Sequence, residues 1–308
     1  MRVEIKSIIC MTDLSDLSNH AVFYGVAMAR ELGAKLYVCH VVDISSAAMY
    51  EVAVSYSLEQ ENRMVNYAYE NLAELLGEVP IDCEAVVTVG HAATEIVRIA
   101  EEKGVGLAVA ASHGRSGLKR LVLGSVTERL MRTLPCPLLV VRGQERGFLT
   151  SGDQDLRLKR ILVGCDFSPD SSLAFQYGLS LAQEFESELH LAHVIAPPVY
   201  KDLLKPAKEK GDEGRRDLRD LLREELTNMV PEDARAWCIP KTALLGGQPH
   251  EELTKYALVN DVDLIVLGVM GHGLVEKLFV GSTTVRVVCR ASCPVLSVRP
   301  MGEGSQED

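Results

Sequence analysis

Two glycine-containing stretches of the chain carry the residue types that could bind a phosphate group. Residues 111–125 read Ala-Ser-His-Gly-Arg-Ser-Gly-Leu-Lys-Arg-Leu-Val-Leu-Gly-Ser, and residues 268–282 read Gly-Val-Met-Gly-His-Gly-Leu-Val-Glu-Lys-Leu-Phe-Val-Gly-Ser. Glycine lets a ligand approach the backbone closely, and the amide groups of the helix start that follows each stretch favour an anion. We therefore interpret both stretches as phosphate cradles. The alternative is a turn that binds nothing, as in many α/β domains.

Basic side chains lie within both stretches. The first contains Arg115, Lys119 and Arg120, and the second contains His272 and Lys277. These cations could neutralise phosphate groups, although exposed basic residues can equally be solvated without a ligand.

The two stretches are equivalent parts of an internal repeat. Asp13 corresponds to Asp166 at an offset of 153 residues, and Gly114 corresponds to Gly271 at an offset of 157. The offset changes once, in a loop between positions 41 and 90. A single change of length in one loop is what two copies of one domain would show.

Each copy predicts five strands that alternate with four helices, which is typical of a doubly wound, mainly parallel sheet. The predicted strands are 7–11, 35–42, 81–89, 105–111 and 138–142, then 160–165, 188–195, 235–245, 262–268 and 295–299. The glycine stretches lead into predicted helices 126–134 and 283–291. The fold class is therefore α/β, with two Rossmann-like domains at 1–142 and 159–300, a linker at 143–158 and a disordered tail at 301–308. Ligands of such sheets bind beyond the carboxyl ends of the strands.

The overall composition excludes several classes of protein. The chain has 308 residues, of which 47% are hydrophobic and 24% charged, which indicates a globular protein long enough for two cores. A net charge of -11 disfavours nucleic acid and anionic membranes as partners. We find no membrane span and no signal peptide, and expect a cytoplasmic protein. The eight cysteines form no C-x-x-C motif, so buried thiols are favoured over a metal site.

Together these features resemble the universal stress protein family in a tandem form that covers nearly the whole chain. The spacing G-x-x-G-x(9)-G-S resembles the ATP-binding motif of that family; the second stretch has all three glycines, whereas the first has Ala111 at the first position. The other shared marks are an Asp after strand one and a His-Val pair that ends strand two. The resemblance implies ATP or AMP, with adenine against the Asp and the strand-two Val, and with any Mg²⁺ held by the phosphates.

The resemblance also implies which positions bind the nucleotide. In the first half they are Thr12, Asp13, Val41, Ala111, Gly114, Gly124, Ser125 and Val126. In the second half they are Cys165, Asp166, Val194, Gly268, Val269, Gly271, Gly281, Ser282 and Thr283.

Several of these residues also have a purely structural interpretation. Asp13 and Asp166 could cap the helix that follows them. Ser125 begins a capping-box pattern that ends at Glu128, whereas Ser282, which we also place at a helix cap, has no acid three residues later.

Three histidines are candidate site residues. His40 and His193 are shared by both halves, but they lie in apolar strands and are interpreted as core histidines with satisfied hydrogen bonds. His113 aligns with Met270 and is therefore not a shared catalytic residue.

We expect a nucleotide-binding protein of stress response or signalling. The alternatives are a slow, divalent-ion-dependent ATPase or phosphotransferase, or one half that binds a different small ligand. The chain has no Walker lysine and no clear general base, so no catalytic residue is assigned. The resemblance suggests that the closing strands 138–142 and 295–299 pair as an intramolecular pseudo-dimer, and further dimerisation of chains is expected. The second half is predicted to bind ATP more tightly, because Ala111 places a Cβ where Gly268 has none.

Overall fold

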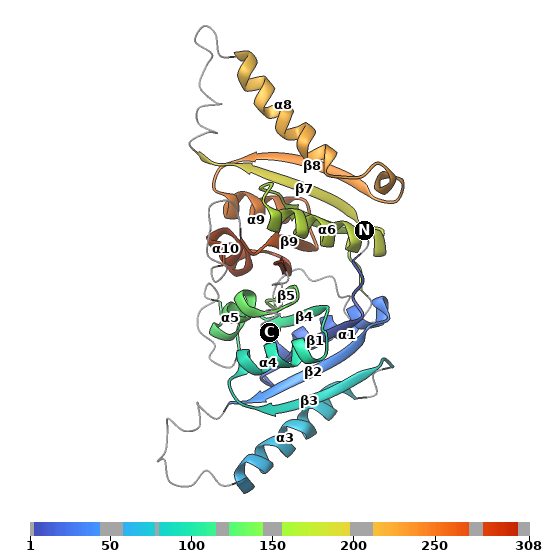
Figure 1. The fold of residues 1–308 in the computed structure, drawn as a ribbon, viewed down its shortest axis with the longest axis vertical. Coiled ribbons are helices and arrows are strands. Elements are labelled where there is room, and N and C mark those ends of the chain that lie inside the picture. Colours follow the sequence, from blue (N-terminus) through green and yellow to red (C-terminus); the bar gives the residue numbers. More distant parts are fainter. Residues whose placement is uncertain are drawn as a thin grey trace, which may run out of the picture. The chain divides into compact units, whose positions relative to one another are not determined.

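The computed structural model describes residues 3–43, 58–77, 80–114, 123–143, 156–197, 212–270 and 280–300. The chain divides into two compact units, a first unit built mainly from Glu4–Gln144 and a second built mainly from Arg157–Pro300. Strands and helices alternate through each unit, as Figure 1 shows. The predicted α/β class with a two-fold repeat is confirmed.

The first unit is built on a parallel sheet with the strand order β3-β2-β1-β4-β5. Strands β2 and β3 are added on one side of β1, and β4 and β5 on the other. The order therefore reverses between β1 and β4, and the carboxyl ends of these two strands form the switch point. The elements are β1 (Ser7–Met11), α1 (Asp16–Leu32), β2 (Lys35–Val42), α3 (Leu58–Leu76), β3 (Cys83–Val89), α4 (Ala92–Glu102), β4 (Leu107–Ala111), α5 (Ser125–Thr133) and β5 (Leu138–Val141).

The second unit repeats this plan with the strand order β10-β9-β6-β7-β8, again parallel. The register repeats as well, since Ile8 pairs with Leu107 in the first unit and Ile161 pairs with Leu264 in the second. The elements are β6 (Arg160–Gly164), α6 (Pro169–Glu184), β7 (Glu188–Ile195), α8 (Asp212–Asn228), a 3₁₀ turn η1 (Asp233–Ala236), β8 (Ile239–Gly246), α9 (Pro249–Val259), β9 (Leu264–Gly268), α10 (Ser282–Arg290) and β10 (Val295–Val298). The pairing of the closing strands across the units stays a prediction.

The first helix of each unit begins at a serine cap and buries one apolar face. Ser15 accepts a hydrogen bond from the Ser18 N–H at the start of α1, and Gly33 ends that helix in the left-handed conformation with φ 61°. The predicted stripe, of which Ala21 and Tyr24 are members, is buried against the sheet. Ser168 caps α6 in the same way.

The sequence-based boundary of the third strand in the second unit is wrong. Strand β8 begins at Ile239, whereas we expected it from position 235, because η1 precedes it. The Pro231 carbonyl accepts from the Ala234 N–H at 3.1 Å, so local turn bonds satisfy this backbone before it reaches the sheet. Among the described helices none has both the length and the apolar character needed to cross a bilayer.

The two units carry ion pairs of opposite sense where their second and third strands begin. Lys35 Nζ lies 3.0 Å from Glu84 Oε2 between β2 and β3. At the equivalent positions of the second unit, Lys241 Nζ lies 2.7 Å from Glu188 Oε2. A cross-strand pair of opposite charges contributes about 0.2–1 kcal/mol to sheet stability.

Candidate functional site

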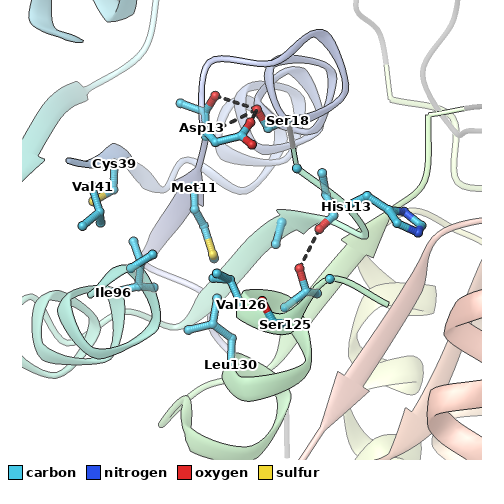
Figure 2. A pocket seen from close by; sticks show the side chains of 17 residues that line it. Met11, Asp13, Ser18, Cys39, Val41, Ile96, His113, Ser125, Val126 and Leu130 are labelled. Carbon is cyan, nitrogen blue, oxygen red and sulfur yellow. Dashed lines mark hydrogen bonds between the residues drawn. The ribbon is translucent and has the colours of Figure 1, made fainter. Parts of the chain in front are cut away.

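Each unit has a cavity at the carboxyl ends of its strands, where the fold predicts a ligand. The first cavity measures about 250 Å³, and its lining includes all eight positions predicted in the first unit (Figure 2). The second measures about 680 Å³, and its lining includes seven of the nine predicted positions. Of the other two, Gly271 lies outside the described residues, and Val269 does not line the cavity.

The aspartate of each unit is bound to the start of the following helix. Asp13 Oδ1 accepts from the Ser15 N–H at 3.1 Å and from the hydroxyls of Ser15 and Ser18, both at 2.6 Å. Asp166 Oδ1 accepts from the Ser168 N–H at 3.0 Å. Because the N-caps are Ser15 and Ser168, neither aspartate is itself the cap. Instead each carboxylate orients the capping residue and also lines a cavity.

The residue after each aspartate has a backbone conformation that sequence reasoning missed. Leu14 and Phe167 occupy equivalent positions and have φ values of 64° and 62°. This left-handed conformation costs a residue with a Cβ about 1–2 kcal/mol. The Leu14 N–H donates to Thr12 Oγ1 at 2.9 Å, and the Phe167 ring lies 4.8 Å from the His193 ring, centroid to centroid. Strain repeated at the same place in both units indicates that the aspartate loop has a required shape.

The two shared histidines form hydrogen bonds with the backbone just before this loop. Nδ1 of His40 lies 2.9 Å from the Thr12 carbonyl oxygen, and Nδ1 of His193 lies 2.8 Å from that of Cys165. A carbonyl oxygen only accepts, so Nδ1 carries the proton in both rings. These contacts agree with the interpretation of both histidines as structural. His113, by contrast, lines the first cavity, with Nδ1 2.8 Å from Ser112 Oγ.

The helices after the glycine stretches begin one residue earlier than the sequence predicts. Their N-caps are Gly124 and Gly281, and neither helix start has a side-chain cap hydrogen bond in the described part of the chain. Ser125 and Ser282 are the first helical residues, so the predicted serine caps and the capping box are wrong. Glu128 forms an ion pair with Arg132, one turn later. Because glycine has no side-chain oxygen, it leaves the amides of the first turn uncovered by a cap, as an anion site requires.

A threonine in the first turn ties each of these helices back to the sheet. Thr127 Oγ1 donates to the Ala111 carbonyl, and Thr284 Oγ1 donates to the Gly268 carbonyl, both at 2.8 Å. Both threonines are buried, and both line a cavity. The sequence contained a signal for them, since they occupy equivalent positions two residues after the Gly-Ser pair.

Val269 belongs to the scaffold and not to the cavity lining. Its N–H donates to the Val298 carbonyl at 2.7 Å, and its carbonyl accepts from the Gly281 N–H at 2.8 Å. Its side chain is buried. Val269 therefore joins the end of β9 to β10 and to the start of α10.

The structure gives Gly268 a packing role that the sequence did not predict. Its φ lies outside the left-handed region, and a Cβ built on it would lie 2.7 Å from both the carbonyl carbon and the Cβ of Asp170. The close approach is therefore between β9 and the start of α6. In the first unit the position of Asp170 holds Leu17, and Ala111 fits at the end of β4.

Asp170 is a buried carboxylate that only the second unit has. Its Oδ2 accepts from the Met270 N–H at 2.9 Å, and its residue is 6% exposed. Burial raises the pKa of Asp170, against the opposing effects of the Met270 hydrogen bond and of Arg299. Asp170 therefore fixes the chain where the second glycine stretch leaves the sheet.

One thiol lines each cavity. Burial raises the pKa of Cys39 and of Cys165 to about 12 in each case. At neutral pH both side chains are thiols and not thiolates, so they form apolar wall and are poor nucleophiles. Among the described residues no three His, Cys, Asp or Glu side chains gather as metal ligands.

Comparison with known proteins agrees with this architecture. The sequence profile of the Universal stress protein family matches residues 4–142 and 157–299. Universal stress protein MJ0531 of Methanocaldococcus jannaschii is 36% identical over 143 residues, which cover 44% of this chain and 82% of that protein. Universal stress protein YxiE of Bacillus subtilis is 34% identical over 139 residues, or 42% of this chain and 94% of that protein.

A solved structure has the same fold over nearly the full length. The crystal structure of a universal stress protein from Archaeoglobus fulgidus superimposes with a TM-score of 0.67 at 21% identity, covering 95% of this chain and 98% of that one. The chain therefore belongs to the universal stress protein family and consists of two such domains in tandem.

Proposed function

We propose that this protein binds an adenine nucleotide, ATP or AMP, at the carboxyl ends of its strands, and that it serves stress response or signalling in the cytoplasm. The observation that carries the proposal is the same in both units. An aspartate loop, an apolar residue from the second strand and a glycine-capped helix start line one cavity. Those are the parts that a base, a ribose and a phosphate chain need.

The base end of the proposed site lies at the ends of the first two strands of each unit. Val41 and Val194 offer an apolar surface for the adenine ring, and Asp13 and Asp166 offer acceptors for an amino or hydroxyl group. Each aspartate has one oxygen in the helix-start bonds described above, so its carboxylate is held in a fixed orientation. A fixed acceptor loses little conformational entropy when it binds.

The phosphate end lies at the glycine-capped helices α5 and α10. The macrodipole places about half a positive charge at such a helix start. This local field favours a phosphate in a protein whose net charge is -11. A Mg²⁺ ion would accompany the nucleotide through its phosphate oxygens. The cations of the glycine stretches, including Arg115 and Lys277, lie outside the described residues.

Binding is favoured over turnover by the environment of the acids. A general base must reach the attacking water and accept its proton. Asp13 and Asp166 are the shared carboxylates of the two cavities, and in each an oxygen already accepts hydrogen bonds from the helix start. We assign both aspartates to the proposed base end, where they would contact the adenine or the ribose and not an attacking water. We therefore propose slow, ion-dependent hydrolysis only as the alternative.

Calorimetric titration of the full-length protein tests the proposal. ATP and AMP should release or absorb heat with dissociation constants between about 1 μM and 1 mM, the range of −8 to −4 kcal/mol in binding free energy. Asp166→Asn keeps the shape of the site but removes the charge, and should weaken binding. A matched exposed control, Asp233→Asn in η1, should leave it unchanged. An absence of heat with both nucleotides at millimolar concentration would refute the proposal.

A further inference from the structure

The two cavities differ at the end of the central strand and on the strand beside it. We call the residues at these two positions the floor of the cavity: Met11 and Ala110 in the first unit, and Gly164 and Leu267 in the second. Strand β1 ends in Met11, whereas the equivalent strand β6 ends in Gly164. Both residues line their cavities. Figure 2 shows the Met11 side chain pointing from the strand end towards Val126, between Val41 on one side and Ser125 on the other. A glycine presents no side chain in the corresponding place.

The neighbouring strand carries the opposite exchange of size. Ala110 on β4 corresponds to Leu267 on β9, and both line a cavity. A Cβ built on Gly164 would lie 2.5 Å from Leu267 Cδ2, so a side chain at 164 would require the leucine at 267 to change its position. The larger side chain of the floor therefore lies on different strands in the two units. It is Met11 on the central strand β1 in the first unit, and Leu267 on β9, just before the glycine stretch, in the second.

The position of this bulk decides which end of the ligand it obstructs. Met11 is the register partner of Cys39, and Cys39 also lines the first cavity, where the second unit has the smaller Ala192. Met11 stands at the end of β1 and Cys39 lies beside it on β2, next to the proposed base end. The first cavity measures about 250 Å³ and the second about 680 Å³. Small-molecule sites usually measure about 300–1,000 Å³, so the first falls below this range and the second within it.

We propose that Met11 is a specificity-determining residue, which excludes the adenine base from the first cavity so that the chain binds one nucleotide, in its second unit. This inference rests on the proposed function. One extra or one missing methylene in an apolar pocket changes affinity by about 10–200-fold. The first unit should therefore bind ATP at least tenfold more weakly than the second. The glycine-capped helix start of the phosphate end is present in both units.

An exchange of the two floors tests the role of Met11. In calorimetric titration with ATP, the wild type should bind one nucleotide per chain. The pair Met11→Gly with Ala110→Leu copies the second floor into the first unit and should raise the stoichiometry to two. The reciprocal pair, Gly164→Met with Leu267→Ala, should remove the tight site. Met11→Leu preserves the bulk and should keep a stoichiometry of one.

A measurement on the wild type covers the case in which an exchanged floor does not fold. Methyl-labelled methionine provides one reporter in each cavity, Met11 in the first and Met270 in the second. On titration with ATP the Met270 methyl resonance should shift, and the Met11 resonance, assigned with Met11→Leu, should stay in place. Two equivalent sites in the wild type, equal shifts of both methyls, or a floor exchange that folds and still binds one ATP would overturn the inference. No ATP binding at all would overturn the proposed function itself.

Discussion

Adding one methyl group at Gly268 should destabilise the second unit without involving any ligand. In Gly268→Ala the new Cβ would lie 2.7 Å from the carbonyl carbon of Asp170 and 3.0 Å from its carbonyl oxygen. Carbon atoms pack best at about 3.5–4.0 Å, so the start of α6 has to move away by close to 1 Å. The carbonyl carbon and oxygen of Asp170 belong to the backbone of α6, so they cannot move away by a rotation of a side chain. The same displacement would stretch the 2.9 Å hydrogen bond from the Met270 N–H to Asp170 Oδ2.

Overpacking of this kind costs about 1–3 kcal/mol of unfolding free energy. The chain has a single tryptophan, Trp237, which lies in the second unit. Urea unfolding followed by tryptophan fluorescence therefore reports on the affected unit. The urea concentration at the midpoint of unfolding should fall, whereas the dependence of the unfolding free energy on urea concentration should stay unchanged.

The matched control is Ala111→Gly, the reverse change at the equivalent position. It should cost the first unit only about 0.5–1 kcal/mol, through added freedom of the unfolded chain, and should leave the fluorescence transition where it was. If Gly268→Ala kept the wild-type midpoint and only weakened ATP binding, the glycine would serve the ligand and not the packing of α6, and our reasoning would be refuted.

Two further predictions concern the second unit. Burial raises the folded-state pKa of Asp170, so the wild type should lose stability as the pH rises from below the unfolded-state pKa of about 3.9 through the folded-state value. Asp170→Asn keeps an acceptor for the backbone and should remove that pH dependence; urea midpoints at pH 3.5 and pH 7 that change equally in both proteins would contradict this. Gly281→Val should abolish the tight ATP site at the α10 helix start, whereas Gly124→Val in the first unit should leave it intact. Calorimetry that gives the opposite ranking would show that the first unit is the better binder.

The repeat and the order of its elements could be predicted because their signals are local. Apolar strand runs, an amphipathic face such as Ala21 to Met28, and a constant offset between copies need no knowledge of distant contacts. The same is true of most cavity residues, since the carboxyl ends of parallel strands meet at one edge.

The features that escaped prediction depend on choices that residue types leave open. Glycine and serine are both accepted at an N-cap, so the Gly-Ser pairs could not say that Gly124 and Gly281 hold that position. Leu14 and Phe167 give no sign of a left-handed backbone, because glycine and asparagine are the usual signals. The reason for Gly268 lies in a tertiary contact with a helix nearly one hundred residues earlier in the chain.

The opposite sense of the two ion pairs has a consequence for how a duplicated chain assembles. Two copies of one fold can exchange strands while they form. In the register that both units use, β2 paired with β8 would bring Lys35 to Lys241, and β7 paired with β3 would bring Glu188 to Glu84. Like charges across strands repel, so only the correct partners attract.

Exchanging the charges of one unit removes this discrimination and keeps the pair between β2 and β3, although it turns the Lys103–Glu84 and Lys35–Asp82 pairs into like-charge contacts. A chain with Lys35→Glu, Glu84→Lys, Asp82→Lys and Lys103→Glu inverts all of these contacts together and should unfold close to the wild-type urea concentration. After dilution from urea it should return less monomer and more strand-exchanged oligomer on size-exclusion chromatography. Equal yields of monomer would mean that other contacts keep the two copies apart. The opposite charge patterns of the two units therefore favour pairing of each strand with the partner from its own copy of the repeat.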